Sequence, residues 1–297
     1  MKRDFLTVMD LSFNELNGLL KRSIDLKKGI DANKCPLIGK SIGLLFEKAS
    51  TRTRISFEVG IYQLGGQAIY MNPREIQIGR GETLHDTAKV MSRYLRGVII
   101  RTFSHKTLEE FARYSSVPVI NGLSDKHHPC QALADLMTIL EKKGKLEGIK
   151  LAFVGDGNNV ANSLIEASSI TKIKMKIACP KGYEPVPDVL KRAKGYVEVL
   201  NDPFKAVENA DVVYTDVWVS MGQEKEALKK KKKFKKYQIN KEVLGQAKKD
   251  AIVLHCMPAH RGEEITDEVM DGPQSVVFDQ AENRLHTQKA LLEFLLS

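Results

Sequence analysis

Segments that read as helices and segments that read as strands alternate along almost the whole chain. This alternation is typical of parallel β-sheets that are covered on both faces by the helices connecting their strands. A capping box formed by Ser12 and Glu15 marks the first helix. Strands are expected over residues 41–47, 67–71, 97–102, 117–121, 150–155, 174–179, 197–200, 211–217, 251–257 and 275–278. Further helices are expected over residues 53–64, 83–94, 107–114, 129–142 and 281–296. The sequence therefore predicts an α/β fold with mostly parallel sheets.

A polar stretch at residues 141–148 interrupts this alternation, and we interpret it as a domain boundary. With 297 residues the chain is long enough for two hydrophobic cores. We therefore expect one domain over residues 1–145 and a second over 146–280, each a mostly parallel sheet with helices on both faces. The C-terminal helix within 281–297 carries leucines for packing, and we expect it to pack back on the first domain.

The formal net charge of +9 comes largely from one tract of lysines. Seven of the eight residues 229–236 are lysine, so the rest of the chain carries 9 − 7, or +2. A basic nucleic-acid-binding protein is an alternative that rests on this tract alone. Because the aromatic residues there that could stack on bases are limited to Phe234 and Tyr237, we favour a solvated helix or loop face and expect no nucleic-acid partner.

The cysteines and the apolar runs indicate the compartment. Cys35, Cys130, Cys179 and Cys256 are widely spaced, and the N-terminus does not resemble a cleavable signal. We therefore expect a reducing, cytoplasmic environment. The apolar runs fall far short of the ~20 residues that a spanning helix requires, so we expect no membrane association.

A candidate anion site follows the strand at 41–47. The loop runs Ser50-Thr51-Arg52-Thr53-Arg54 and opens a helix. Unpaired backbone N–H groups at a helix N-terminus favour an anion, while the hydroxyls add donors and Arg52 adds a planar cation. The alternative is that the hydroxyls only cap the helix and the arginines are solvated. Two arginines among three hydroxyls favour a phosphate site, here without a Walker lysine or a glycine-rich loop.

A second group of polar side chains surrounds the start of the helix at 129–142. His128 and Gln131 lie in its first turn and can hydrogen-bond a carbonyl or amide of a ligand. Arg101, at the end of the strand 97–102, has the same position at a carboxyl edge, where ligands bind in open parallel sheets. A histidine near a helix start is more often structural, and we interpret the neighbouring His127 in that way.

In the second half, the segment 154–160 resembles a dinucleotide fingerprint but lacks its third glycine, because Val160 stands there. A nicotinamide cofactor, and with it a dehydrogenase, is therefore disfavoured. Asn159 can offer a neutral amide to a zwitterionic substrate, whereas Asn158 is interpreted as a helix cap.

Two later strand ends carry polar groups. Asp216 ends an apolar strand, which is costly unless the carboxylate faces a cation or a hydrogen-bond donor. Cys256 follows His255 at the mouth of another strand and is a candidate ligand contact, although this pair does not by itself establish nucleophilic catalysis. The spacing of histidines and cysteines does not predict a zinc site.

Four segments now allow a comparison with a known family. They are Ser50 to Arg54, His128-Pro129-Cys130-Gln131, Asp216 with Ser220-Met221-Gly222, and His255-Cys256-Met257-Pro258. Their order resembles that of the ornithine carbamoyltransferases over essentially the whole chain. The Ser-Met-Gly and His-Cys-x-Pro segments are similar to ornithine enzymes rather than to aspartate enzymes.

This resemblance implies roles for individual residues. It implies that carbamoyl phosphate is bound by Ser50, Thr51, Arg52, Thr53, Gln77, Arg101, His128, Gln131, Cys256, Met257 and Arg284. Gln77 is expected to complete the phosphate site across a subunit interface. It implies that ornithine is bound by Asn159, Asp216, Ser220 and Met221. Catalytic roles are expected for Arg52, Arg101, His128 and Cys256, with no metal and no cofactor.

The resemblance further implies transfer of a carbamoyl group from carbamoyl phosphate to the side-chain amine of L-ornithine, giving L-citrulline and phosphate in arginine biosynthesis, by a homotrimer or an assembly of trimers. Putrescine, aspartate or a modified ornithine is an alternative amine. Either the cysteine position or the phosphate can take the displaced proton, and the sequence leaves both open, as it leaves the physiological direction of the reaction.

Overall fold

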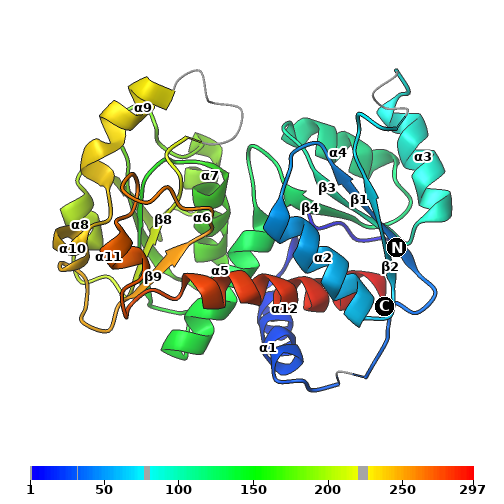
Figure 1. Cartoon of the computed structure of the whole chain (residues 1–297), viewed down its shortest axis with the longest axis horizontal. Coiled ribbons are helices and arrows are strands. Elements are labelled where there is room, and N and C mark those ends of the chain that lie inside the picture. Colours follow the sequence, from blue (N-terminus) through cyan, green and yellow to red (C-terminus); the bar gives the residue numbers. More distant parts are fainter. Residues whose placement is uncertain (1, 32, 77–80, 220–226) are drawn as a thin grey trace. The chain divides into compact units, whose positions relative to one another are not determined.

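The computed structural model describes residues 2–31, 33–76, 81–219 and 227–297. The predicted α/β fold is confirmed: the chain forms two compact units, residues 1–137 with 282–297 and residues 138–281, each with a parallel sheet (Figure 1). None of the described helices is long and apolar enough to cross a membrane.

The first unit is built on a four-stranded parallel sheet in the order β2-β1-β3-β4. Its strands are β1 Ser41–Phe46, β2 Gln67–Met71, β3 Gly97–Arg101 and β4 Val119–Leu123. Its helices are η1 Val8–Asp10, α1 Phe13–Lys27, α2 Thr51–Gln63, α3 Leu84–Tyr94 and α4 His105–Tyr114, with most of α5 Pro129–Lys143. Every residue of the inner strand β3 is buried, and so is every residue of β4 at the edge of the sheet, where Phe5 forms an isolated parallel bridge to Ile120.

The second unit is built on a five-stranded parallel sheet in the order β7-β6-β5-β8-β9. Its strands are β5 Lys150–Val154, β6 Lys174–Ala178, β7 Val197–Leu200, β8 Val212–Thr215 and β9 Ile252–His255. Its helices are α6 Asn159–Thr171, α7 Pro187–Arg192, α8 Pro203–Val207, α9 Ala227–Phe234, η4 Lys235–Tyr237, α10 Lys241–Leu244 and α11 Asp267–Met270.

The C-terminal helix α12, Val277–Leu296, packs against the first unit as predicted. Arg22 of α1 donates from Nε to Glu293 Oε2 at 2.7 Å. Leu296 packs so closely on β3 that a Cβ added to Gly97 would lie 2.9 Å from its Cδ2 atom. A glycine at this position therefore lets the helix end approach the sheet.

The strand predicted at residues 275–278 is wrong. Ser275 forms an isolated parallel bridge to Val253, and α12 begins two residues later at Val277. A short apolar run such as Val276 to Phe278 fits a buried strand or a buried helix equally well, and the long helix that follows decides between them.

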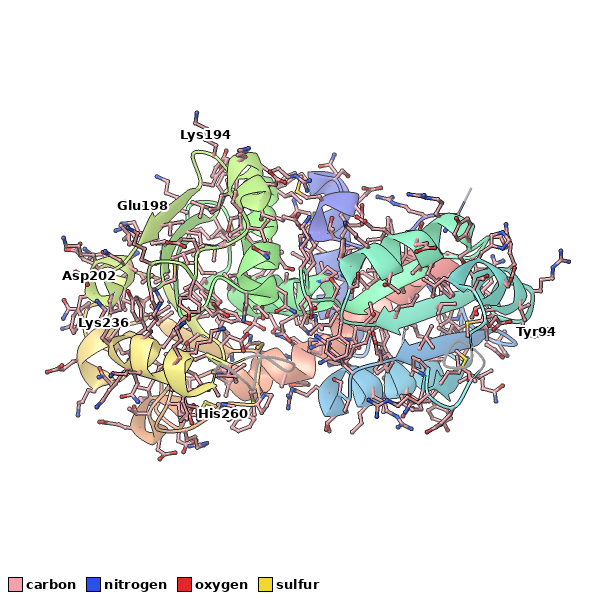
Figure 2. All side chains as sticks on the ribbon, turned by 90° about the horizontal axis from the view of Figure 1, so that it is seen from above. Tyr94, Lys194, Glu198, Asp202, Lys236 and His260 are labelled. Carbon is pink, nitrogen blue, oxygen red and sulfur yellow. The ribbon has the colours of Figure 1, made fainter. Side chains whose placement is uncertain are left out.

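The prediction of a solvated face for the lysine tract is wrong at one residue. Lys236 lies on the outer surface of its unit (Figure 2), and Lys232 and Lys233 are also exposed. Lys230 is only 3% exposed and forms an ion pair inside the second unit. Phe234 is fully buried as well, so it is not available to stack on nucleic-acid bases.

Candidate active site

The candidate phosphate loop, residues 50–54, lies at the N-terminus of α2, as the sequence predicts. Ser50 is the N-cap, and its Oγ accepts a hydrogen bond from Thr53 N at 3.2 Å. Thr53 is buried, whereas Arg52 is half-buried and Thr51 is exposed. Arg54 points elsewhere, because its Nε donates to Glu58 Oε1 at 2.9 Å. The hydroxyl of Ser50 thus caps the helix, and the cation of this loop that belongs with the site is Arg52.

Arg284 of α12 joins this loop to the start of α5. Its Nη1 donates to Gln131 Oε1 at 2.7 Å, and its Nη2 donates to Thr53 Oγ1 at 3.0 Å. Gln131 in turn donates from Nε2 to Asp135 Oδ1 at 2.9 Å. All four side chains are buried. Three sequence-predicted residues from distant parts of the chain therefore meet at one place, and Asp135, which the sequence analysis missed, orients the amide.

The charges of three arginines act on the buried His128. Burial, and then the charges of Arg284, Arg101 and Arg52, hold its pKa well below the usual range. The imidazole is therefore neutral at pH 7, and three guanidinium groups act on the space around it. Cys130 nearby has a pKa raised to about 12 by burial, so its thiol is not a nucleophile there.

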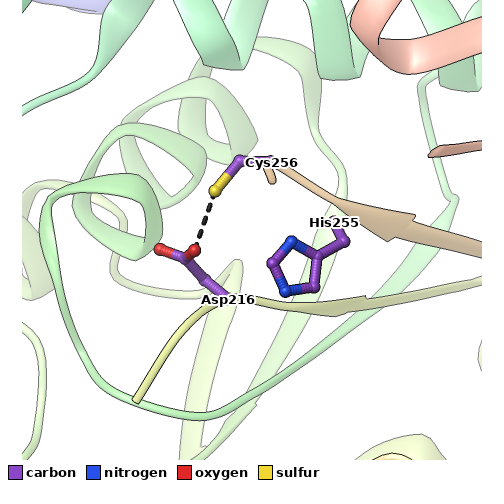
Figure 3. Close-up of side chains that lie close together, drawn as sticks. All are labelled: Asp216, His255 and Cys256. Atoms are coloured by element: carbon purple, nitrogen blue, oxygen red, sulfur yellow. Dashed lines mark hydrogen bonds between the residues drawn. The ribbon is translucent and has the colours of Figure 1, made fainter. Parts of the chain in front are cut away.

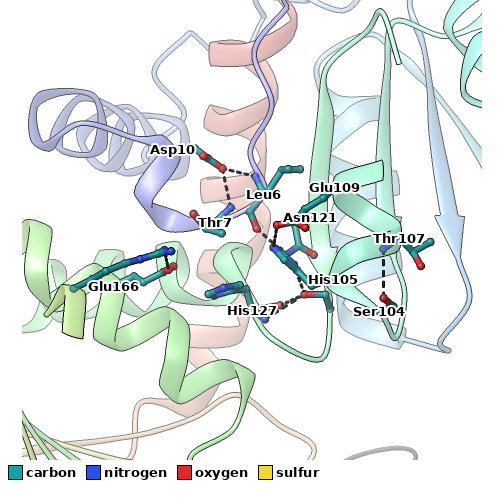
Figure 4. A network of polar contacts seen from close by, with 12 residues as sticks. Leu6, Thr7, Asp10, Ser104, His105, Thr107, Glu109, Asn121, His127 and Glu166 are labelled. Carbon is teal, nitrogen blue, oxygen red and sulfur yellow. Dashed lines mark hydrogen bonds and ion pairs between the residues drawn. The ribbon is translucent and has the colours of Figure 1, made fainter. Parts of the chain in front are cut away.

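A polar network around His127 holds the loop that precedes α5 (Figure 4). Ser124 Oγ lies 2.8 Å from His105 Nδ1 and accepts from His127 N at 3.2 Å. The rings of His105 and His127 meet edge to face at 4.9 Å. Asn121 of β4 holds the N-terminal segment by donating from Nδ2 to Leu6 O at 2.8 Å. The structural role that the sequence indicated for His127 fits these contacts.

The second unit gathers Asp216, Cys256 and His255 at the carboxyl ends of β8 and β9 (Figure 3). Cys256 Sγ donates to Asp216 Oδ1 at 2.8 Å. Asn158 Nδ2 donates to Asp216 Oδ2 at 2.6 Å. The carboxylate is 5% exposed and therefore meets the donors that its burial requires.

Asn158 has two functions that the sequence analysis did not combine. Its Oδ1 caps α6 by accepting from Val160 N at 3.0 Å and Ala161 N at 3.1 Å, as expected. Its Nδ2 is thereby directed to Asp216. The adjacent Asn159 is half-buried as the first residue of α6. The signal in the sequence was the pair of asparagines after a strand, but the pattern does not say which of the two meets Asp216.

His255 supports the turn that presents Cys256. Its Nδ1 accepts from Met257 N at 2.8 Å, and its Nε2 lies 3.1 Å from Glu264 Oε1, with both side chains fully buried. Met257 has a φ of 55°, a left-handed conformation that costs a non-glycine residue energy and that the hydrogen bond from its own N–H to His255 helps to hold. Glu264 was not found from the sequence, because a loop separates it from His255 and no regular helix or strand spacing predicts their contact.

Two groups of side chains could offer ligands to a metal within the described part of the chain. The atoms of Asp216, His255 and Cys256 lie within 4.8 Å of one another, as do those of His260, Glu263 and Glu264. In the first group both ring nitrogens of His255 are already engaged in hydrogen bonds. The geometry therefore favours the hydrogen-bonded arrangement over coordination of a metal there.

Gln77, Ser220 and Met221 lie outside the described residues. Their predicted roles thus stay predictions from the sequence.

Comparison with known proteins assigns both units to one family. Residues 3–141 match the family described as aspartate/ornithine carbamoyltransferase, carbamoyl-P binding domain, and residues 147–295 match its Asp/Orn binding domain. The chain belongs to the aspartate/ornithine carbamoyltransferase family. Family members that are highly identical to this chain carry the name ornithine carbamoyltransferase. The one from Syntrophus aciditrophicus is 54% identical over 100% of both chains, and the one from Thermococcus kodakarensis is 54% identical over 99% of this chain and 96% of its own.

Solved structures of the same family agree. The ornithine carbamoyltransferase from Pyrococcus furiosus gives a TM-score of 0.95 at 50% identity, covering 99% of this chain and 97% of its own. The one from Thermus thermophilus gives 0.93 at 44% identity over 100% of both chains. The family resemblance drawn from four short segments is confirmed over the full length.

Proposed function

We propose that this chain is an ornithine carbamoyltransferase. It transfers the carbamoyl group of carbamoyl phosphate to the side-chain amine of L-ornithine and releases L-citrulline and phosphate. The observation that carries the proposal is the 54% identity, over the full length, to relatives of that name. The positive site around His128 and the buried carboxylate of Asp216 support it, because the two substrates need those two kinds of partner.

In this proposal the first unit binds carbamoyl phosphate. The phosphate lies against the N-terminus of α2, where Ser50, Thr51, Arg52 and Thr53 surround it, and Gln77 from a neighbouring subunit completes the site. Arg101, His128, Gln131 and Arg284, with Cys256 and Met257, orient the carbamoyl group. The guanidinium groups stabilise the oxyanion that forms when the amine attacks, and they neutralise the leaving phosphate.

The second unit binds ornithine. The carboxylate of Asp216 attracts the α-ammonium group, and Asn159, Ser220 and Met221 hold the remaining groups of the amino-acid end. The uncharged side-chain amine is then placed against the carbonyl carbon, so that positioning supplies much of the acceleration. The thiol of Cys256 is engaged as a donor to Asp216, which favours the phosphate as acceptor of the displaced proton.

The same proposal includes a cytoplasmic homotrimer, or an assembly of trimers, that acts in arginine biosynthesis. The sequence resemblance supports these parts.

A steady-state assay tests the activity. With carbamoyl phosphate as donor, we expect citrulline from ornithine, and rates lower by at least about 100-fold with putrescine or aspartate. Aspartate has no side-chain amine, and putrescine lacks the α-carboxylate of the amino-acid end. If putrescine or aspartate is carbamoylated faster than ornithine, the enzyme class stands and the assigned amine is wrong. If none of the three amines is carbamoylated, the activity itself is wrong.

A further inference from the structure

Lys230 differs from the exposed lysines of its tract in being almost fully buried, at 3% exposure. Its Nζ donates to Asp156 Oδ2 at 2.5 Å. The same atom lies 5.4 Å from the ring centre of Tyr183 and 5.7 Å from that of Phe234, within range of a cation–π attraction. Among the described residues the ammonium thus meets a close counter-ion and two aromatic rings, and its removal leaves the buried carboxylate of Asp156 without that counter-ion.

The other end of this ion pair lies in the turn between β5 and α6. Asp156 is two residues before Asn158, which donates to Asp216 at 2.6 Å. The turn has little freedom to shift, since a Cβ added to Gly157 would lie 2.3 Å from the backbone nitrogen of Pro185. A contact that fixes this turn therefore also fixes the amide that holds Asp216.

Lys230 also offsets the repulsion between two carboxylates, those of Asp156 and Asp216. Burial raises the pKa of Asp156, the charge of Lys230 lowers it, and the nearby charge of Asp216 raises it. Two carboxylates thus repel each other inside the unit, and the ammonium compensates one of them. Without it, Asp156 has to take up a proton or move, and both changes disturb the turn.

We propose that Lys230 is a positioning residue for ornithine: its ammonium holds the turn that carries Asn158 and, through Asn158, fixes the carboxylate of Asp216. This inference rests on the proposed function, in which Asp216 receives the α-ammonium of ornithine. It assigns a role to one lysine of a tract that otherwise covers the surface.

Paired substitutions on one helix test this role. Lys231 is the matched control, because it follows Lys230 in α9 and its Nζ also lies 2.5 Å from a carboxylate, Glu263 Oε1, but it is half-exposed. In Lys230→Met we expect the KM for ornithine to rise by about tenfold or more while the KM for carbamoyl phosphate stays within about twofold. Lys231→Met leaves both within about twofold, and Lys230→Arg recovers most of the ornithine KM.

A loss of stability alone does not produce this split between the two KM values, and thermal melting of each variant records it separately. If Lys230→Met does not fold, Asp156→Asn decides, with the same rise expected for ornithine alone. Two outcomes overturn the role. In the first, the KM for ornithine is unchanged in Lys230→Met or, if that variant does not fold, in Asp156→Asn. In the second, the KM for ornithine and the KM for carbamoyl phosphate rise together. Failure of the proposed function is seen instead in the unsubstituted enzyme, which then forms no citrulline from ornithine, and the inference falls with it.

Discussion

The first unit combines two kinds of side chain at its candidate site, one neutral imidazole and three guanidinium groups. Arg52, Arg101 and Arg284 supply positive charge, and their charges together with burial lower the pKa of His128. The neutral ring offers one hydrogen-bond donor and one acceptor, so it can orient a bound group by hydrogen bonds but adds no charge. In the proposed reaction this suits the carbamoyl group, which is polar and uncharged, whereas the phosphate next to it is a dianion.

The depressed pKa of His128 predicts how stability depends on pH. The unfolded state, with a histidine pKa near 6.5, takes up a proton that the folded state does not, so stability is full above that value and is lost as pH falls below it. The loss from one such group is about 1.4 kcal/mol for each pH unit below the unfolded pKa, until the folded pKa is reached.

Urea unfolding between pH 5 and pH 7.5 measures this loss. In His128→Asn we expect a free energy of unfolding that declines less steeply below about pH 6.5. His105 and His286, whose pKa values burial also lowers, keep part of the slope in both proteins. The exposed His85 provides the control, His85→Asn. An unchanged slope in His128→Asn contradicts the assignment of a buried neutral imidazole.

Asp216→Asn removes one charge and little volume from the second unit. Since Asn158 and Cys256 both donate to this side chain, the substitution also exchanges one acceptor for a donor. We expect the KM for ornithine to rise by about ten- to hundredfold, as for loss of a charge-assisted hydrogen bond, with little change in the KM for carbamoyl phosphate. Asp211→Asn, just before the same strand and paired with Lys248, is the control. An unaltered KM for ornithine would falsify the proposed ion pair between Asp216 and the α-ammonium of ornithine.

At the scale of elements, local chemistry predicted helix starts well. Ser12 with Glu15 caps α1 as the sequence predicts, because a cap depends on three or four neighbouring residues. Ser50 caps α2, which the sequence analysis gave as the alternative to a phosphate contact. The start of α12 was missed, since Val277 and Phe278 are apolar in either a strand or a helix. The choice there depends on packing that no local pattern contains.

The lysine tract shows the same limit for a single side chain. A run of identical residues gives no periodicity from which to choose the buried one, and the partner, Asp156, is 74 residues away. The hydrogen bond from Asn158 to Asp216 and the role of Glu264 escaped the sequence analysis for the same reason, because each acts on a residue that folding brings to it. The sequence thus indicates which loops carry the chemistry, and the structure is needed to show which side chains support them.

At the scale of the whole molecule, net charge was the weakest guide to function. The excess of +9 comes mostly from the tract at 229–236, whereas the positive charges of the proposed site are three arginines that act on His128. Position relative to the carboxyl ends of parallel strands was the better guide, and it predicted polar sites in both units. Assembly is a further level, because the resemblance assigns Gln77 to a neighbouring subunit's site.

A complementation experiment tests whether the proposed sites are shared between subunits. Arg52→Ala and Gln77→Ala are each expected to lose nearly all turnover. Hybrids are made by dissociating an equal mixture of the two variants and letting the subunits reassociate. If Gln77 serves a neighbouring subunit, some sites of these hybrids contain an intact Arg52 from one chain and an intact Gln77 from another. Random assembly restores both residues in about one quarter of the sites, since each is intact with a chance of one half.

The matched control for this experiment mixes Arg52→Ala with Arg101→Ala. Both arginines act on His128 of the same chain, so each chain in that mixture carries a defective site and no hybrid recovers activity. Citrulline formation by the two mixtures, normalised to the unsubstituted protein treated in the same way, gives the answer. A mixture of Arg52→Ala and Gln77→Ala that stays as inactive as the control places Gln77 in the site of its own chain and removes the reason for expecting a trimer from the active site.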